Sequence, residues 1–223
     1  MIVIGQPMSI VVTIISKELR ELAAARGTIL LGVVVATFFS FVLSGSGSVV
    51  AAFFAPLLTG MGVAYYGCSQ VFLREKTDFV IETLLCSPVT LRDLWLGKTL
   101  GVTLFANAFA LSVATLTLLA GGDTEYPLLS AVLFLAAVVP LAIACLVGAR
   151  GYAQLLLGMR ESHAVSLGLL MLLILILRVL NQSAQALLVP SNLGTLALGL
   201  AVVLVGLALC ARLLSPERIV TSL

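Results

Sequence analysis

The fold is decided by one polar stretch, Arg74-Glu-Lys-Thr-Asp-Phe-Val-Ile-Glu-Thr-Leu-Leu-Cys-Ser-Pro-Val-Thr-Leu-Arg-Asp-Leu-Trp-Leu-Gly-Lys98. Eight of the 22 Lys, Arg, Asp and Glu residues of the chain fall in it. It is also the longest interval without an apolar run of membrane-spanning length. Because long apolar runs lie on both sides, we expect a compact surface segment between two membrane-spanning helices.

The inside of this stretch predicts a short helix, a break and the start of a second helix. Its middle is an apolar patch that carries one carboxylate, Glu82, so we expect an amphipathic helix over residues 78–86. The Ser-Pro pair at Pro88 ends that helix, because the residue before a proline is pushed out of the α region. Thr90 is then placed to cap the next helix, with Asp93 at its third position.

The composition places the chain among integral membrane proteins. It has 223 residues, of which 61% are hydrophobic and only 10% are charged, and its mean hydropathy is +1.22. Soluble domains carry about 25% charged residues. The net charge of +2 is spread along the edges of the apolar runs and gives no reason to expect a nucleic-acid partner. The four cysteines are scattered and there is one histidine, so no metal site is expected.

Six apolar runs are near the roughly 20 residues that a 30 Å hydrocarbon core requires. The sequence therefore predicts an all-α integral membrane protein with six transmembrane helices in a single domain over residues 1–223. Two runs contain a proline, Pro56 and Pro140, which membrane helices tolerate where neighbouring helices satisfy the freed carbonyl groups. The runs cover residues 28–43, 49–73, 100–120, 128–149, 164–180 and 193–211.

The basic residues predict the orientation. If there are six spans, eleven of the 12 Lys and Arg residues fall on one side of the membrane, and only Arg178 falls on the other. Cytoplasmic loops carry an excess of Lys and Arg. We therefore expect a multi-pass protein of the cell (plasma) membrane, with both termini and the loop over residues 74–98 in the cytoplasm.

Residues 1–27 predict an amphipathic helix that lies in the membrane interface. The charged block follows the apolar run instead of preceding it, which is not the order of a secretory signal. The alternative is a charged extension of the first span. The apolar residues at helical spacing are Ile10, Ile14, Leu19, Leu22 and Ala23, and the charged residues opposite are Lys17, Arg20 and Glu21.

The polar stretch resembles the first cytoplasmic loop of the permease subunits of type-2 ATP-binding-cassette (ABC) transporters. In that family an acidic residue, a threonine-leucine-glutamate-like core, a leucine pair, a small residue with proline and a late Gly-Lys recur in this order. The order of six spans with a preceding interfacial helix is similar as well. One departure is Asp78-Phe79, where the family more often has a glycine-containing turn. The corresponding residues here are Glu75, Ile81-Glu82-Thr83-Leu84-Leu85, Ser87-Pro88 and Gly97-Lys98.

The resemblance implies a permease subunit, most simply of an exporter, that hydrolyses no ATP itself. Two permease subunits, as a homodimer or a heterodimer, would form the pathway, and two separate ATPase subunits would bind the ATP beneath them. The helix over residues 78–86 would then be a coupling helix seated in a groove on an ATPase. The residues expected to make this contact are Glu75, Asp78, Phe79, Glu82, Leu84, Leu85 and Pro88.

Three polar residues are candidates for a substrate pathway. Asn107 and Gln154 lie within or near the ends of apolar runs, where a polar side chain is expected to face the interior of the bundle. Arg178 lies toward the outer end of the fifth run. It could meet an anionic or amphiphilic substrate, or extend to the outer lipid headgroups.

Other functional classes have weaker support in the sequence. Gly97-Lys98-Thr99 is no phosphate-binding loop, because the position five residues before the Gly-Lys pair is Arg92 instead of glycine. An intramembrane enzyme would need a buried acid–base pair, and no histidine lies within a run. A secondary transporter would show inverted repeats and charged midplane residues. An assembly factor and a haem-exporter-like permease stay open as alternatives.

The orientation can be tested with reporter fusions. A fluorescent protein fused after Leu223 is expected to fluoresce, because that end is predicted to lie in the cytoplasm. Alkaline phosphatase fused after Glu125 is expected to be active, because the segment around that residue is predicted to lie outside. Phosphatase activity from a fusion after Leu223 would contradict the predicted topology.

Overall fold

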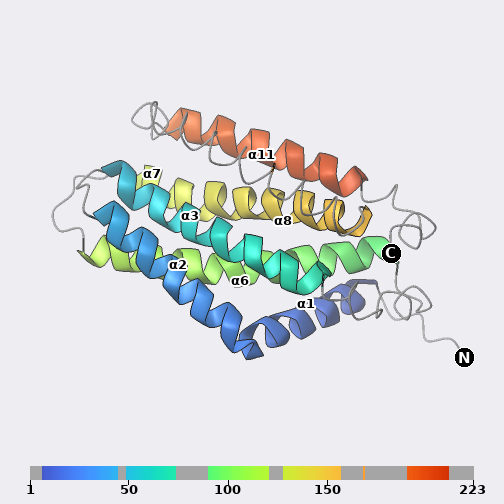
Figure 1. Ribbon diagram of the computed structural model, residues 1–223. Helices are drawn as coiled ribbons and strands as arrows, with labels where there is room; N and C mark the ends of the chain where they lie inside the picture. The colour runs from blue at the N-terminus through green and yellow to red at the C-terminus, as the bar shows by residue number, and fades with distance from the viewer. Residues whose placement is uncertain are drawn as a thin grey trace, which may run out of the picture.

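The computed structural model describes residues 7–44, 49–73, 90–120, 128–156, 168 and 190–210. Within these ranges the chain is helical apart from Ala25 and Thr90 and has no strand (Figure 1). The predicted helix over residues 78–86 and the fifth predicted span, residues 164–180, lie outside the described residues apart from Gly168. The elements are α1 (Pro7–Ala24), α2 (Arg26–Ser44), α3 (Val49–Cys68), η1 (Ser69–Leu73), α6 (Leu91–Ala120), α7 (Leu128–Leu133), η2 (Phe134–Val138), α8 (Val139–Leu156) and α11 (Pro190–Cys210), where η marks a π-helical turn.

Several of these helices are long and apolar enough to cross a membrane. In the described ranges three stretches have this length and composition: Leu91–Thr117, Leu129–Leu156 and Ser191–Cys210. A fourth is obtained if Ile10–Ala24 and Arg26–Phe38, which are bent by 75° at their junction, count together as one broken span. The chain is therefore all-helical where it is described, with three or four candidate spans, which indicates a membrane protein.

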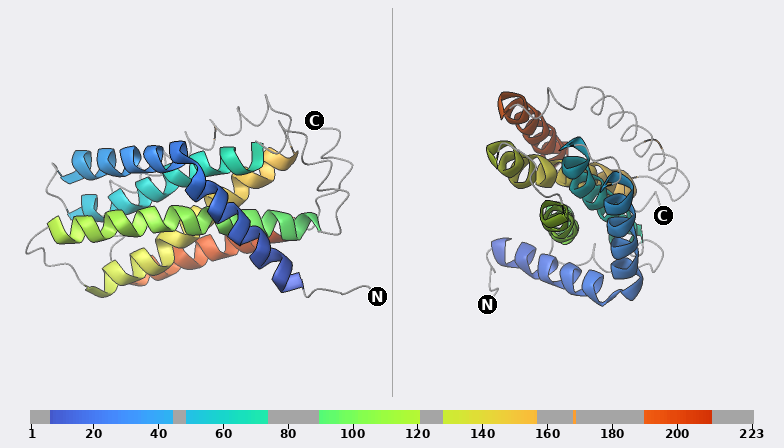
Figure 2. Two further views of the ribbon diagram at one scale, coloured as in Figure 1. Left: turned by 90° about the horizontal axis from the view of Figure 1, so that it is seen from below. Right: turned by 90° about the vertical axis from the view of Figure 1, so that its left-hand side faces the viewer.

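Helices α3, α6 and α8 form the centre of the bundle. α3 packs against both α6 and α8, and α6 also contacts α8. α2 covers α3 on one side, and α11 lies against α8 at the opposite edge (Figure 1). Figure 2 shows α1 running across α6, which lies between α1 and helices α3 and α8.

Helix α6 begins where the sequence predicts. The backbone N–H of Asp93 donates to Thr90 Oγ1 at 3.2 Å, and the Thr90 hydroxyl donates to Asp93 Oδ2 at 2.7 Å. These two bonds confirm Thr90 as the N-cap and Asp93 as the third helical residue. The helix starts at Leu91, before the third apolar run. Lys98, expected in the loop, therefore lies inside α6.

The fourth apolar run contains a π-helical turn just before its proline. η2 covers Phe134–Val138, and Pro140 is the second residue of α8. A proline in a helix interior lacks an N–H and its ring crowds the carbonyl four residues earlier. The wider π turn relieves that crowding, so the helix continues past the proline. α8 extends to Leu156, which places Arg150, expected in a loop, inside the helix.

Glycines in α3 allow its neighbours to come close. A Cβ atom built on Gly62 would lie 3.0 Å from Val35 Cγ1, and one built on Gly67 would lie 3.2 Å from Val102 Cγ1. One built on Gly60 would overlap Ile143 Cδ1 of α8. Small residues let helix backbones approach in this way in membrane bundles.

The outer faces of the bundle are apolar. Phe41 of α2 is 80% exposed and Leu198 of α11 is 67% exposed, and large aliphatic side chains of α6 and α7 are exposed as well. Soluble proteins rarely expose so many large apolar side chains on several helices. A lipid environment accounts for it.

Helix α1 packs its apolar side on the bundle. Leu22 is buried, and Ile14 and Ile15 lie against α6, while Lys17 and Glu21 are exposed. Its spacing predicts that the apolar side lies in the lipid interface, but in the structure much of that side contacts α6. One buried residue on this side is charged, Glu18.

Crowding at Gly60 can be tested by substitution. Gly60→Leu is expected to lower the apparent unfolding temperature in detergent, because the new side chain has no space between α3 and α8. Overpacking of this kind costs about 1–3 kcal/mol. Gly199→Leu is the control, because nothing lies within 4 Å of a Cβ built on Gly199. Equal unfolding temperatures for the two variants would contradict the close approach of α3 and α8.

Candidate functional site

The candidate site surrounds the last described turns of α3 and η1, just before residue 74. α3 ends in the π turn η1. A backbone carbonyl oxygen has two lone pairs, so it can accept a hydrogen bond from a cation in addition to its bond within the helix. Two cations from other helices bind carbonyl groups of α3 and η1, Arg150 of α8 and Lys98 of α6. We call Arg150 and Lys98, with the groups that they contact, the α3-end site.

Arg150 joins α8 to α3. One terminal guanidinium nitrogen donates to the Tyr65 carbonyl at 2.7 Å, and the other donates to Ser69 Oγ at 2.7 Å. The guanidinium also lies 3.3 Å from the centroid of the Tyr65 ring. A stacked guanidinium with two short hydrogen bonds has a fixed position. Arg150 is only 3% exposed, so these contacts lie inside the bundle.

Gln154 completes this side of the site. It lies one turn after Arg150 in α8 and is buried. The surrounding donor and acceptor groups fix the orientation of its side-chain amide. In that orientation the amide nitrogen donates to the Cys68 carbonyl at 3.2 Å, and the amide oxygen accepts from Arg150 Nε at 3.3 Å. The side chain therefore joins the guanidinium to one more carbonyl group of α3.

Close packing brings α8 to this position. A Cβ atom built on Gly151 would lie 2.7 Å from Cζ of the Phe72 ring, so any other residue there would displace the ring. A Cβ atom built on Gly148 would lie 3.3 Å from Cζ2 of Trp95 in α6. These two glycines on either side of Arg150 let its helix approach η1 and α6.

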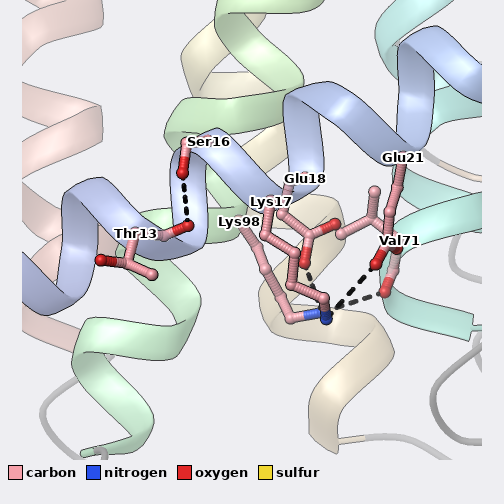
Figure 3. Close-up of polar contacts among 7 residues, drawn as sticks. All are labelled: Thr13, Ser16, Lys17, Glu18, Glu21, Val71 and Lys98. Atoms are coloured by element: carbon pink, nitrogen blue, oxygen red, sulfur yellow. Dashed lines mark hydrogen bonds and ion pairs between the residues drawn. The ribbon is translucent and has the colours of Figure 1, made fainter.

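Lys98 joins α6 to the same helix end and to α1. Its Nζ donates to the Val71 carbonyl at 3.2 Å and lies 3.5 Å from Glu18 Oε1 (Figure 3). The ammonium also lies 5.6 Å from the centroid of the Phe72 ring. The side chains of Lys98 and Glu18 are 1% and 3% exposed. A buried ion pair is costly to desolvate unless further hydrogen bonds satisfy it, and the carbonyl of Val71 supplies one.

Two glycines of α6 allow α1 to reach Lys98. A Cβ atom built on Gly97 would lie 2.7 Å from Ile14 Cγ2, and one built on Gly101 would lie 3.1 Å from Glu18 Cβ. Helix α1 therefore lies directly on the backbone of α6. This contact brings the short side chain of Glu18 within reach of the ammonium group.

The structure brings one of the predicted site residues into this site. Gln154, predicted to face the bundle interior, lies there. Asn107 is half-buried in α6 and does not contact the site. Their role in a substrate pathway stays a prediction. The other predicted residues lie outside the described residues: Glu75, Asp78, Phe79, Glu82, Leu84, Leu85, Pro88 and Arg178.

Sequence reasoning missed the importance of Glu18, Lys98 and Arg150. Lys98 and Arg150 stand at the edges of apolar runs, so the sequence places them in loops, where they indicate orientation and, for Lys98, the family resemblance, but no buried contact. A signal was present, because each has glycines close by on its helix, Gly97 and Gly101 for Lys98 and Gly148 and Gly151 for Arg150. A charge beside small residues at helical spacing indicates a cation that a neighbouring helix covers.

Comparisons with known proteins do not place the chain in a family. No family model matches it, and no significant match was found among curated proteins or solved structures. In the described part of the chain, no group of three or more His, Cys, Asp and Glu residues is arranged to hold a metal ion.

Loss of the guanidinium is expected to destabilise the bundle. Arg150→Met removes the donors to Tyr65, Ser69 and Gln154, and losing the partner of a buried polar group costs about 1–3 kcal/mol. Trp95, the only tryptophan, is buried at the contact with α8, so its fluorescence during heating in detergent reports separation of α6 from α8. The apparent unfolding temperature should fall.

Arg92→Met is the matched control for this experiment. Arg92 is exposed in the first turn of α6, so its loss should change the unfolding temperature little. If both variants unfold at the wild-type temperature, the hydrogen bonds of Arg150 do not stabilise the bundle.

Proposed function

We propose that this chain is the membrane-spanning permease subunit of a type-2 ABC transporter, acting as an exporter. The observation that carries the proposal is a contact between the two described helices on either side of residues 74–89. Val71 lies just before that segment and Lys98 lies shortly after it, and the two are joined by a hydrogen bond. If residues 74–89 form the predicted surface segment, helices joined in this way are suited to receive force from a docked partner.

Helix α1 supports the same function. It precedes the candidate spans, turns by 75° into α2, and contacts the first turns of α6. An interfacial helix in this position is what the resemblance to type-2 permeases implies. Its exposed side carries Lys17 and Glu21, which suits the boundary between membrane and water.

The proposed mechanism places ATP hydrolysis in a separate partner. Phe79, Leu84 and Leu85 would enter an apolar groove on an ATPase subunit, and Glu82 would pair with a basic residue there. Closure of two ATPases around ATP would move the helix over residues 78–86 as a lever. That motion would shift the spans of two permease subunits and open a pathway between them. This chain would bind no nucleotide.

The location follows from the same proposal. The ATPases are cytoplasmic, so the segment over residues 74–89 and both termini would lie in the cytoplasm and the spans in the cell membrane. An acidic surface helix suits a protein partner better than anionic lipid, because Asp78 and Glu82 would be repelled by negative headgroups.

Co-purification from native membranes tests the proposal. The tagged chain, extracted in a gentle detergent, is expected to bring down an ATPase with nucleotide-binding motifs, identified by mass spectrometry. Glu82→Arg and Leu85→Arg should reduce the recovered ATPase by about tenfold or more, as expected for central contacts of an interface.

The control substitution is Ser46→Arg, which adds the same single charge as Leu85→Arg to a turn predicted to face the other side of the membrane. It should leave ATPase recovery unchanged. Recovery of the chain without any ATPase in several detergents would overturn the proposed function, and equal losses for all three variants would remove the docking role from residues 82 and 85.

A further inference from the structure

The ammonium group of Lys98 is shared by three elements of the structure. Lys98 itself belongs to α6, which follows residues 74–89, and its Nζ binds the carbonyl of Val71 in η1, which precedes them. The same Nζ pairs with Glu18 of α1 (Figure 3). A displacement of residues 74–89 would therefore reach this ammonium from both ends of the segment.

Burial makes the ion pair between Glu18 and Lys98 strong and keeps its partners fixed. Glu18 and Lys98 are almost completely covered, so neither charge can exchange its partner for water while the helices stay in place. An interaction in a low dielectric is also stronger than the same pair in water. The carboxylate, and with it α1, should follow the ammonium when α6 or η1 moves.

The connection continues from α1 into α2. The backbone N–H of Ala25 donates to the carbonyl of Glu21 at 3.0 Å, and the N–H of Thr28 donates to the carbonyl of Ala25 at 2.9 Å. Ala25 is the single residue between the two helices. Hydrogen bonds therefore hold Ala25 to α1 on one side and to α2 on the other, and no loop separates the two helices, so a displacement of α1 moves the start of α2.

Helix α1 also contains an ion pair that lacks these properties. Lys17 and Glu21 lie 3.6 Å apart, one turn apart on the same helix, and each side chain is 53% exposed. Exposed pairs of this kind are weak and are screened by salt. This pair joins no other element through its salt bridge, so it is a matched control for Glu18 and Lys98.

We propose that Glu18 and Lys98 are positioning residues that transmit the state of residues 74–89 to α1 and, through the bend at Ala25, to α2. This inference rests on the proposed function, because it takes the docked ATPase as the source of the motion. It adds the route by which docking acts on the first helices of the chain. Neither residue touches substrate or nucleotide in this role.

The test follows the contact between α1 and α6 by cysteine alkylation. Ile14 packs against Gly97, so Ile14→Cys reports whether α1 lies on α6. The substitution is made in full-length protein in which the four native cysteines are changed to alanine, co-purified with its ATPase. Alkylation by a maleimide is measured without nucleotide and with a non-hydrolysable ATP analogue. We expect rates that differ by about fivefold or more between the two states, the usual size of coupling between sites.

The decisive variant is Glu18→Gln together with Lys98→Met. Removing both charges leaves neither partner buried alone, so the chain should still fold and run as a single species in gel filtration. Alkylation without nucleotide should become faster, and the dependence on the ATP analogue should disappear. Glu18→Gln alone is a second variant. Its alkylation rate is also expected to lose the dependence on the ATP analogue.

The control is Lys17→Met together with Glu21→Gln, which also removes one lysine and one glutamate from the chain. Its alkylation rates should match those of the reference in both states. The inference is overturned if the Glu18/Lys98 double variant keeps the nucleotide dependence of the reference, or if the control loses it as well.

Failure of the proposed function gives a different result. In that case no ATPase accompanies even the reference protein, and alkylation does not respond to the ATP analogue in any variant. That result would overturn both the proposed function and the transmission role. A response that persists in the Glu18/Lys98 double variant would overturn only the transmission role and would not contradict the proposed function.

Discussion

The packing of α3 depends on two cations that are buried in a low-dielectric environment. A buried charge costs free energy until hydrogen bonds or an opposite charge satisfy it. The cations are Arg150 and Lys98, which come from two other helices and donate to carbonyl groups of α3 and η1. The same contacts therefore satisfy the cations and join α3 to α6 and α8.

Much of the helical framework could be predicted from composition and periodicity. Apolar runs gave helices where α2, α3, α6, α8 and α11 are found, and the Thr90 cap could be recognised because capping is a local interaction between residues three apart. Helix ends were less accurate. A hydropathy pattern ends a span at the first charge, but α6 and α8 continue through Lys98 and Arg150 because another helix covers those charges.

The α3-end site could not be derived in the same way, because it joins residues that are distant in the sequence. Nothing near Glu18 indicates that its partner is Lys98, and periodicity alone places the apolar side of α1 in lipid and not on α6. Gln154 was recognisable because a polar side chain among apolar neighbours is conspicuous. Its partner is the backbone carbonyl of Cys68. Every residue has such a group, so the sequence does not indicate which carbonyl accepts the hydrogen bond.

The distance along the chain between Glu18 and Lys98 has a consequence for biosynthesis. Glu18 leaves the ribosome early, while α6, which carries its partner and the two glycines that receive α1, is made only after α2, α3 and the polar segment. Until then α1 has no protein surface to cover its apolar side, and its carboxylate must stay hydrated near the membrane surface. Docking of α1 on α6 is consequently a late step of assembly. A chain that stops before α6 leaves α1 exposed, a feature that quality-control proteases can recognise.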